Sequence, residues 1–225
     1  MLERGASFRS LEAEAAPRSL REEAYDIIKQ RIIRGLYRPG EALSEAVVSS
    51  SLSLGRTPVR QAFDRLMRDG LVEVLPRKGI IVRPITADEI RDMVHVRLLN
   101  EGFCARLAAE RADQAVLGVL NDTLDQSHKA ARDSDIETLM VLDRRFHAAL
   151  ASAAGNAVLS DILSNLHDRS QRVWFLSLRE HQHHARVVEE HAGIVAAISA
   201  RDPEGAEAVM RAHILSFAEN LSRQL

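Results

Sequence analysis

The sequence of 225 residues has a single cysteine, few aromatic residues and no long hydrophobic run. One cysteine, Cys104, excludes an internal disulfide or a zinc site made of several cysteines, and it indicates a reducing compartment. No apolar stretch approaches the roughly 20 residues that cross a bilayer, and residues 1–20 lack the apolar core of a secretory signal. We therefore expect a cytoplasmic protein with no membrane partner. Aromatic residues make up only 4%, whereas Ala, Leu, Arg and Glu are abundant, which favours helices over sheets.

The net charge of −2 conceals a difference between the two parts of the chain. Residues 1–87 hold 15 Lys and Arg against 11 Asp and Glu, a balance of +4, whereas residues 88–225 hold 15 against 21, a balance of −6. Phosphate binding requires local basic groups rather than a basic protein as a whole. The charge distribution is therefore compatible with a nucleic-acid-binding front part followed by an acidic remainder.

Three helices are expected in the first part of the chain. Residues 1–18 are polar and without a steady period, which is typical of a flexible arm. From residue 20 to 33 apolar residues recur at helical spacing, until Gly35 ends the run. Ser44 is a suitable N-cap for a second, short helix, and Thr57-Pro58 opens a third helix because proline is permitted in a first turn.

A hairpin is expected directly after the third helix. Two short β-prone segments, Leu71–Leu75 and Ile80–Pro84, are joined by the basic sequence Pro76-Arg77-Lys78-Gly79. Three helices followed by a basic hairpin predict a winged helix-turn-helix domain over residues 19–85.

The start of the third helix carries residues suited to reading DNA. In a helix-turn-helix the N-terminal end of the second helix of the motif enters the major groove. Arg56 and Arg60 are four residues apart and share one helix face, so both are candidates for guanine or phosphate contacts, with Thr57 beside them. At the hairpin tip Arg77 and Lys78 offer cations, and Gly79 permits close approach of the backbone. The alternative is a surface helix with solvated arginines beside an ordinary turn.

The second part, residues 88–225, contains no convincing strand. Helical apolar periodicity returns in six segments joined by short connections, which predicts an antiparallel six-helix bundle and a mainly α protein. The six segments are residues 88–111, 113–131, 135–154, 157–178, 183–200 and 204–223.

Four polar residues of the second part fall on inward-facing positions. Asp143 and His147 are four residues apart on one helix, while His191 and His213 lie among apolar neighbours at helical spacing. Burying three imidazoles and a carboxylate is costly unless something satisfies them. A divalent metal ion such as Zn, Ni, Fe or Mn would do so, because neutral imidazole and carboxylate both ligate these ions.

For any single histidine, a hydrogen-bonded place in the core is a more common role than metal ligation. This interpretation is applied to the remaining histidines, and the group at residues 181–184 is expected to be a solvated turn. They are His95, His128, His167, His181, His183 and His184.

The front part resembles the GntR family of bacterial regulators. The resemblance rests on the run from Leu52 to Leu66 (LSLGRTPVRQAFDRL), on Asp69–Val72 (DGLV) and on Arg77–Gly79 (RKG), and it covers roughly residues 19–85. Three positions depart from the usual pattern of the family. Gly55 stands in place of Ser or Thr, Ser53 in place of a turn glycine, and Ala46 in place of an arginine.

The second part is similar to the FCD effector domain, which defines the FadR subfamily of these regulators. The matching pieces are Asp143-x3-His147, Glu190-His191 and the helix around His213. The resemblance implies that Asp143, His147, His191 and His213 hold a divalent metal, Zn, Ni or Mn, and that a small carboxylate binds there. It also implies a homodimer and an effector-binding role for Arg97, whose alternative role is an ion pair with Glu101. Asn156 and Arg172 are further candidates for the lining of the effector site.

These features together predict a DNA-binding regulator, most simply a repressor of a palindromic operator, with residues 88–225 binding metal and effector and forming the dimer. An alternative is a regulator for which the metal ion itself is the signal. A metal-dependent hydrolase is a further alternative, because an open metal position activates water. The sequence contains no HExxH helix, nucleophile elbow or phosphate loop that would support an enzyme.

Overall fold

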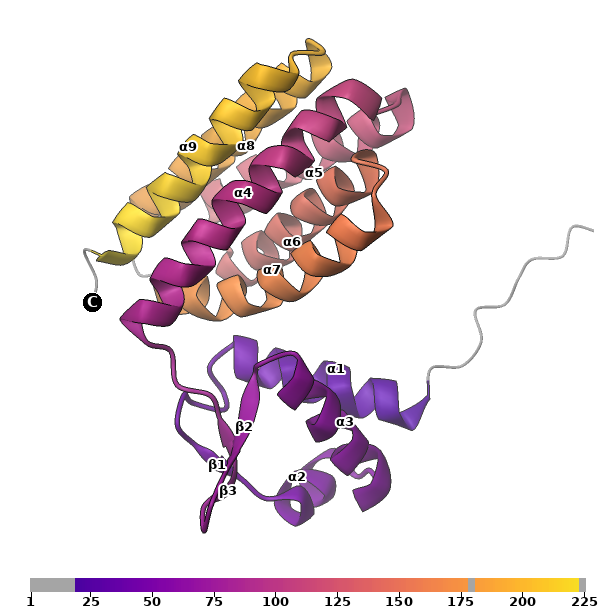
Figure 1. The fold of residues 1–225 in the computed structure, drawn as a ribbon, viewed down its shortest axis with the longest axis vertical. Coiled ribbons are helices and arrows are strands. Elements are labelled where there is room, and N and C mark those ends of the chain that lie inside the picture. Colours follow the sequence, from indigo (N-terminus) through magenta and orange to yellow (C-terminus); the bar gives the residue numbers. More distant parts are fainter. Residues whose placement is uncertain (1–18, 178–180, 223–225) are drawn as a thin grey trace, which may run out of the picture.

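The computed structural model describes residues 19–177 and 181–222, so the arm expected at residues 1–18 lies outside the described residues. The described chain forms two hydrophobic cores. The smaller core joins apolar side chains between Ala24 and Val82, and the larger joins those between Ile90 and Leu221, with Ile33 added from the first helix. Figure 1 shows the two parts one above the other, and we call them the winged domain and the helical domain.

The winged domain is built on three helices, α1 (Leu20–Ile33), α2 (Glu45–Leu52) and α3 (Arg56–Arg68). Helix α1 begins with a capping box, in which Ser19 and Glu22 satisfy each other's backbone N–H groups. Ser44 is the N-cap residue of α2, but its side chain makes no capping hydrogen bond. The inner face of α3 supplies Val59, Ala62, Phe63 and Leu66 to the smaller core.

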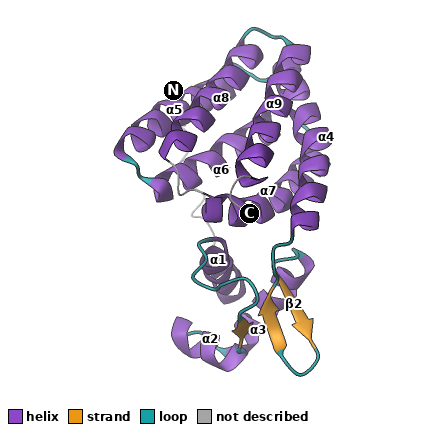
Figure 2. Cartoon of the chain, turned by 90° about the vertical axis from the view of Figure 1, so that its left-hand side faces the viewer, coloured by secondary structure: helices purple, strands orange, loops and turns teal. Residues whose placement is uncertain are grey.

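A three-stranded antiparallel sheet completes the winged domain, with strand order β1-β3-β2. Strands β2 (Val72–Leu75) and β3 (Gly79–Val82) form the expected hairpin, pairing Val72 with Val82 and Leu75 with Gly79. Strand β1 (Ala42–Leu43) was not expected, because two residues are too short to show an alternating pattern. The hairpin tip lies at the end of the molecule that faces away from the helical domain (Figures 1 and 2).

The helical domain confirms the predicted mainly α architecture with a six-helix bundle. Helix α4 packs along α9, and α5 lies against α6 and α8. None of the described helices is long and apolar enough to span a membrane. The helices are α4 (Ala87–Arg111), α5 (Gln114–Asp133), α6 (Ile136–Ala153), α7 (Ala157–Ser177), α8 (His181–Ser199) and α9 (Pro203–Ser222).

The winged domain contacts helix α7 of the helical domain. Lys29 of α1 is buried and places its Nζ 3.0 Å from Asp168 Oδ2. Asn165 donates to the backbone carbonyl of Asp69, at the end of α3, over 3.4 Å. Next to Asp168, Arg169 donates to Glu89 over 2.5 Å and so ties α7 to the start of α4 within the helical domain. Asn165 and Asp168 are three residues apart, so one face of α7 makes both contacts with the winged domain.

The turn between α2 and α3 contains a residue in the left-handed conformation. Ser53 ends α2 with φ 54° and ψ 32°. This conformation costs a residue with a Cβ roughly 1–2 kcal/mol, and glycine adopts it freely. The departure from the family pattern at Ser53 therefore stores a small strain directly before α3.

We expect Ser53→Gly to raise the free energy of unfolding of the winged domain by about 0.5–1 kcal/mol, because the strain at φ 54° is removed. Hydrogen exchange of the α2 and α3 amides in increasing urea measures this change in the full chain. Ser50→Gly, at an exposed helical position of α2, is the matched control and should lower the same free energy by up to about 1 kcal/mol. Equal effects of the two substitutions would contradict the assignment of strain to Ser53.

Candidate functional site

The recognition surface is the exposed side of α3. The helix begins at Arg56 behind the N-cap residue Gly55, which provides no side-chain capping hydrogen bond. Arg56, Thr57 and Arg60 are all exposed, whereas Val59 between them is buried. The N-terminal turn of α3 therefore presents two cations and a hydroxyl to the solvent.

The wing adds a second group of exposed cations. Arg77, Lys78 and Gly79 are exposed at the turn between β2 and β3, where Arg77 has φ 67° and Gly79 has φ 75°. Within residues 19–177 and 181–222, none of the basic residues named at Arg56, Arg60, Arg77 and Lys78 forms an ion pair, so their charges are available to phosphates.

The four residues predicted to bind a metal lie together in the helical domain. Asp143 and His147 come from α6, His191 from α8 and His213 from α9. The three histidines are buried, and their ligating nitrogens lie within 4.8 Å of one another. Asp143 Oδ1 is 3.8 Å from both His147 Nε2 and His191 Nε2. The helix packing thus joins residues that are up to 70 positions apart in the sequence.

Each histidine of this group contacts a neighbouring side chain that fixes the orientation of its ring. Glu190 lies 2.8 Å from His213 Nδ1, and Glu101 lies 3.2 Å from His147 Nδ1. The ring of His191 stacks on Phe146 with a centroid distance of 4.0 Å and an angle of 9° between the planes. A carboxylate on Nδ1 fixes the imidazole tautomer and leaves Nε2 unprotonated as a ligand.

Burial shifts the pKa values of several groups in this site. Burial, together with the neighbouring His213 and His147, lowers the pKa of His191 well below its usual value, so this ring is neutral at pH 7. Burial opposes ionisation of Glu190, but hydrogen bonds with His213 and Ser216 and the charge of Arg186 together outweigh it and lower the pKa of this carboxyl. Burial raises the pKa of Asp143.

The donor set fits a first-row divalent cation. His191 Nε2 is buried and has no hydrogen-bond partner within the described part of the chain. Three imidazoles and one carboxylate match the ligands that Zn, Ni and Mn accept. A space of about 20 Å³ adjoins them, lined by Arg97, Asp143 and His213 among others. This volume is sufficient for about one water molecule.

His167 also belongs to this region, although we expected an isolated core histidine there. Its ring centroid is 4.0 Å from that of His147, and Glu101, His147 and His167 form a second group of potential ligands within 4.8 Å. Burial lowers the pKa of His167 well below its usual value, and His147 adds to the shift. The signal was present in the sequence, since His167 falls four residues after Leu163 on the inner face of α7.

The expectation of a solvated turn at residues 181–184 is wrong. Helix α8 begins at His181, and the side chain of His184 is buried, while the side chains of His181 and His183 lie outside the described residues. His184 precedes His191 by seven residues, so both fall on one face of the helix. His95 is exposed and His128 is half-buried, and neither belongs to the two groups of potential ligands.

The three residues predicted to bind an effector lie in three different environments. Arg97 is buried beside the cluster in a bidentate ion pair with Glu101, whose shorter contact is 2.5 Å. Asn156 accepts a hydrogen bond from the backbone N–H of Leu159 in the first turn of α7, over 3.1 Å. Arg172 donates to the carbonyl of Arg83 between the domains, and burial lowers its pKa to about 10.

Asn156 and Arg172 therefore do not line the water-sized space beside Asp143 and His213, contrary to our expectation. Asn156 directly precedes α7 and caps its first turn. Arg172 lies on the face of α7 that contacts the winged domain. Sequence spacing alone does not distinguish the two faces of α7, because both are largely buried.

Comparison with known proteins agrees with this geometry. Residues 20–82 match the family of bacterial regulatory proteins named gntR, and residues 92–216 match the FCD domain. The HTH-type transcriptional repressor RspR of Escherichia coli K12 is 28% identical over 200 residues, which are 89% of this chain and 88% of that protein. The repressor GlaR of the same organism is 30% identical over 202 residues, 86% of this chain and 92% of that protein.

Solved structures show the same fold. McbR/YncC of E. coli superimposes with a TM-score of 0.83 at 21% identity, over 92% of this chain and 99% of that one. A GntR regulator from Rhodococcus sp. RHA1 superimposes with a TM-score of 0.76 at 25% identity, over 91% and 99%. The chain thus belongs to the GntR family of bacterial regulatory proteins with an FCD domain, and it is a transcriptional regulator rather than an enzyme.

Proposed function

We propose that this regulator is a cytoplasmic repressor whose operator affinity is set by a small carboxylate at a divalent metal held by Asp143, His147, His191 and His213. The observation that carries the proposal is the convergence of three buried imidazoles and one carboxylate in the helical domain. When bound, the metal would supply a Lewis-acidic position for a carboxylate oxygen. RspR and GlaR, both of which are described as repressors, support the sign of the regulation.

The chain's own residues would preorganise this site. Glu101 and Glu190 orient two of the imidazoles, and the stack on Phe146 orients the third. Arg97 lies against the water-sized space next to Asp143, with its charge already balanced by Glu101. An effector larger than a water molecule would have to displace side chains there. Such a rearrangement would shift α7 and, through it, the winged domain.

A homodimer that binds a palindromic operator is part of the proposal. Helix α4 exposes Val96, Leu99 and Phe103, which recur at three and four residues and form one apolar stripe. An exposed apolar stripe of this kind suits a self-complementary interface. Two winged domains related by a twofold axis would then read two half-sites of double-stranded DNA.

A regulator that senses the metal ion itself is the second candidate. The small volume beside the four ligands favours it, because about 20 Å³ leaves no room for an organic acid without rearrangement. Titration of operator affinity against metal ions and, separately, against a panel of mono-, di- and tricarboxylates in the metal-loaded protein distinguishes the two functions.

We expect Arg60→Gln to weaken binding to the selected operator by about 1–3 kcal/mol, because a bidentate contact to a base or phosphate is lost. The operator is obtained by selection from random duplexes with the wild-type protein, and affinity is measured by fluorescence anisotropy. Arg68→Gln, at the opposite end of α3, is the matched control and should change the affinity little. Similar losses in both variants would indicate that the N-terminal end of α3 does not read the operator.

We expect His213→Ala to reduce bound metal from about one ion per chain to a small fraction and to lower the melting temperature of the helical domain. Metal content is measured by mass spectrometry after loading with Zn, Ni or Mn and desalting. His95→Ala, which replaces an exposed histidine outside the cluster, is the control and should keep the metal. Wild-type protein that retains none of the three ions would refute the metal site while leaving DNA binding untouched.

A further inference from the structure

The winged domain is attached to the helical domain at two separate places. The first is the linker of residues 83–86 between β3 and α4, where the Arg83 carbonyl accepts a hydrogen bond from Arg172 of α7. The second is α1, which lies beneath α7 in Figure 1. A domain held only by a short linker is free to pivot, whereas a second attachment fixes its direction. The contacts of α1 therefore decide how firmly the winged domain is oriented.

Helix α1 and the recognition helix α3 form one rigid unit. Tyr25 of α1 donates a hydrogen bond of 2.7 Å to Asp69, the C-cap residue of α3. The Cζ atom of Arg65, also on α3, lies 3.8 Å from the centroid of the Tyr25 ring. Both helices supply the smaller core, with Ile28 from α1 and Phe63 from α3. A contact that fixes α1 therefore also fixes α3.

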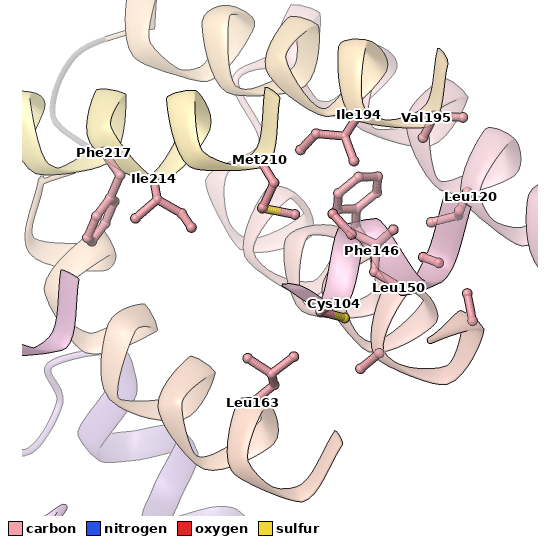
Figure 3. Packing of buried hydrophobic residues seen from close by; sticks show 14 of the residues in the cluster. Cys104, Leu120, Phe146, Leu150, Leu163, Ile194, Val195, Met210, Ile214 and Phe217 are labelled. Carbon is pink, nitrogen blue, oxygen red and sulfur yellow. The ribbon is translucent and has the colours of Figure 1, made fainter. Parts of the chain in front are cut away.

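Helix α7 is in turn fixed to the rest of the helical domain. Its residue Leu163 is buried in the larger core. Figure 3 shows Leu163 pointing from α7 toward the side where Cys104 and Leu150 lie. Arg144 of α6 forms an ion pair with Asp168 of α7 and so joins these two helices. A contact with α7 is therefore a contact with the helical domain as a whole.

The buried ion pair of Lys29 and Asp168 joins these two units. Lys29 Nζ lies 3.0 Å from Asp168 Oδ2, and the two side chains are only 11% and 6% exposed. Within residues 19–177 and 181–222, Asp168 is the only carboxylate that pairs with Lys29, whereas Asp168 also pairs with Arg144. A buried ammonium group that loses its partner carries a large free-energy cost. Removal of the Asp168 charge would therefore drive Lys29 into water and separate α1 from α7.

The other contacts of α1 and α3 with the helical domain orient the winged domain less firmly. Arg34 and Glu137 form an ion pair of 3.4 Å, but their side chains are 40% and 71% exposed, so water screens it. Asn165 reaches the Asp69 carbonyl only over 3.4 Å. Ile33 is buried in the larger core, but an apolar contact is non-directional. The direction of the winged domain thus depends mainly on the buried ion pair.

We propose that the pair of Lys29 and Asp168 aims the two recognition helices of the homodimer and so sets the half-site spacing that the dimer accepts. Both are positioning residues, because they lie at the domain junction and not on the exposed side of α3. The inference rests on the proposed homodimer and palindromic operator, and it names the residues that determine which operator spacing is read. Two added base pairs turn one half-site by roughly 70° and move it by about 7 Å, a change that fixed recognition helices cannot follow.

The test compares two operators that differ only in the spacing of their half-sites. The first is selected from random duplexes with the wild-type protein, and the second carries two additional base pairs at its centre. The full-length wild-type protein should bind the second operator about a hundredfold more weakly, because the second winged domain no longer reaches its half-site. Fluorescence anisotropy gives both dissociation constants and hence their ratio, which we call the spacing ratio.

Asp168→Asn should lower the spacing ratio to less than about tenfold, because winged domains that pivot on the linker reach both spacings. A substitution that merely destabilises the fold weakens both complexes alike and leaves the ratio unchanged. Lys29→Met should have a smaller effect, since Asp168 keeps Arg144 as its partner. The double variant with Lys29→Met and Asp168→Asn should recover most of the wild-type ratio, because no unpaired ammonium group is left to bury.

Arg144→Gln is the matched control, because it removes a partner of the same carboxylate but leaves the bridge between the domains intact. Hydrogen exchange of the α1 amides verifies that the winged domain remains folded in each variant. A spacing ratio that survives Asp168→Asn, that Arg144→Gln lowers equally, or that the double variant does not restore overturns the inference and leaves the homodimer standing. A wild-type protein that sediments as a monomer and selects single half-sites overturns the homodimer and this inference together.

Discussion

The burial of charged and polar side chains within the helical domain is the constraint on which the structure depends. Imidazoles and carboxylates removed from water require partners. Glu101 illustrates the solution, since its carboxylate is shared between Arg97 on its own helix and His147 on α6. Burial alone would raise the pKa of Glu101, but Arg97 together with His147 lowers it well below the usual value. The same network orients the rings that converge beside Asp143.

The same constraint governs the contact between the domains. Lys29 and Asp168 form a buried ion pair, and the remaining lone pairs of Asp168 accept from Arg144. Because each member is held by the others, displacement of one changes the environment of all. Helix α7 therefore has two roles at once, with His167 facing the histidines and the next residue, Asp168, facing the winged domain. This placement joins the histidine group of the helical domain physically to α1 of the winged domain.

Much of the fold and part of the site could be predicted from periodicity and turn chemistry. The six helices of the bundle, the recognition helix and the hairpin follow from apolar spacing and from breakers such as Gly35. The inward positions of His147, His191 and His213 follow in the same way. Strand β1 could not be predicted, because two residues carry no period, and the burial of His184 was missed where a polar composition suggested a turn.

By itself the sequence determined the class of the protein, through the motif around Arg56–Arg60 and the Asp143-x3-His147 spacing, because local patterns dictate helix faces and caps. Only the tertiary structure decided which faces meet. It brought His167 and Glu101 to His147, removed Asn156 and Arg172 from the space beside Asp143 and His213, and paired Lys29 with Asp168 across 139 positions. Such contacts depend on how whole helices pack against one another, and no local spacing specifies that arrangement.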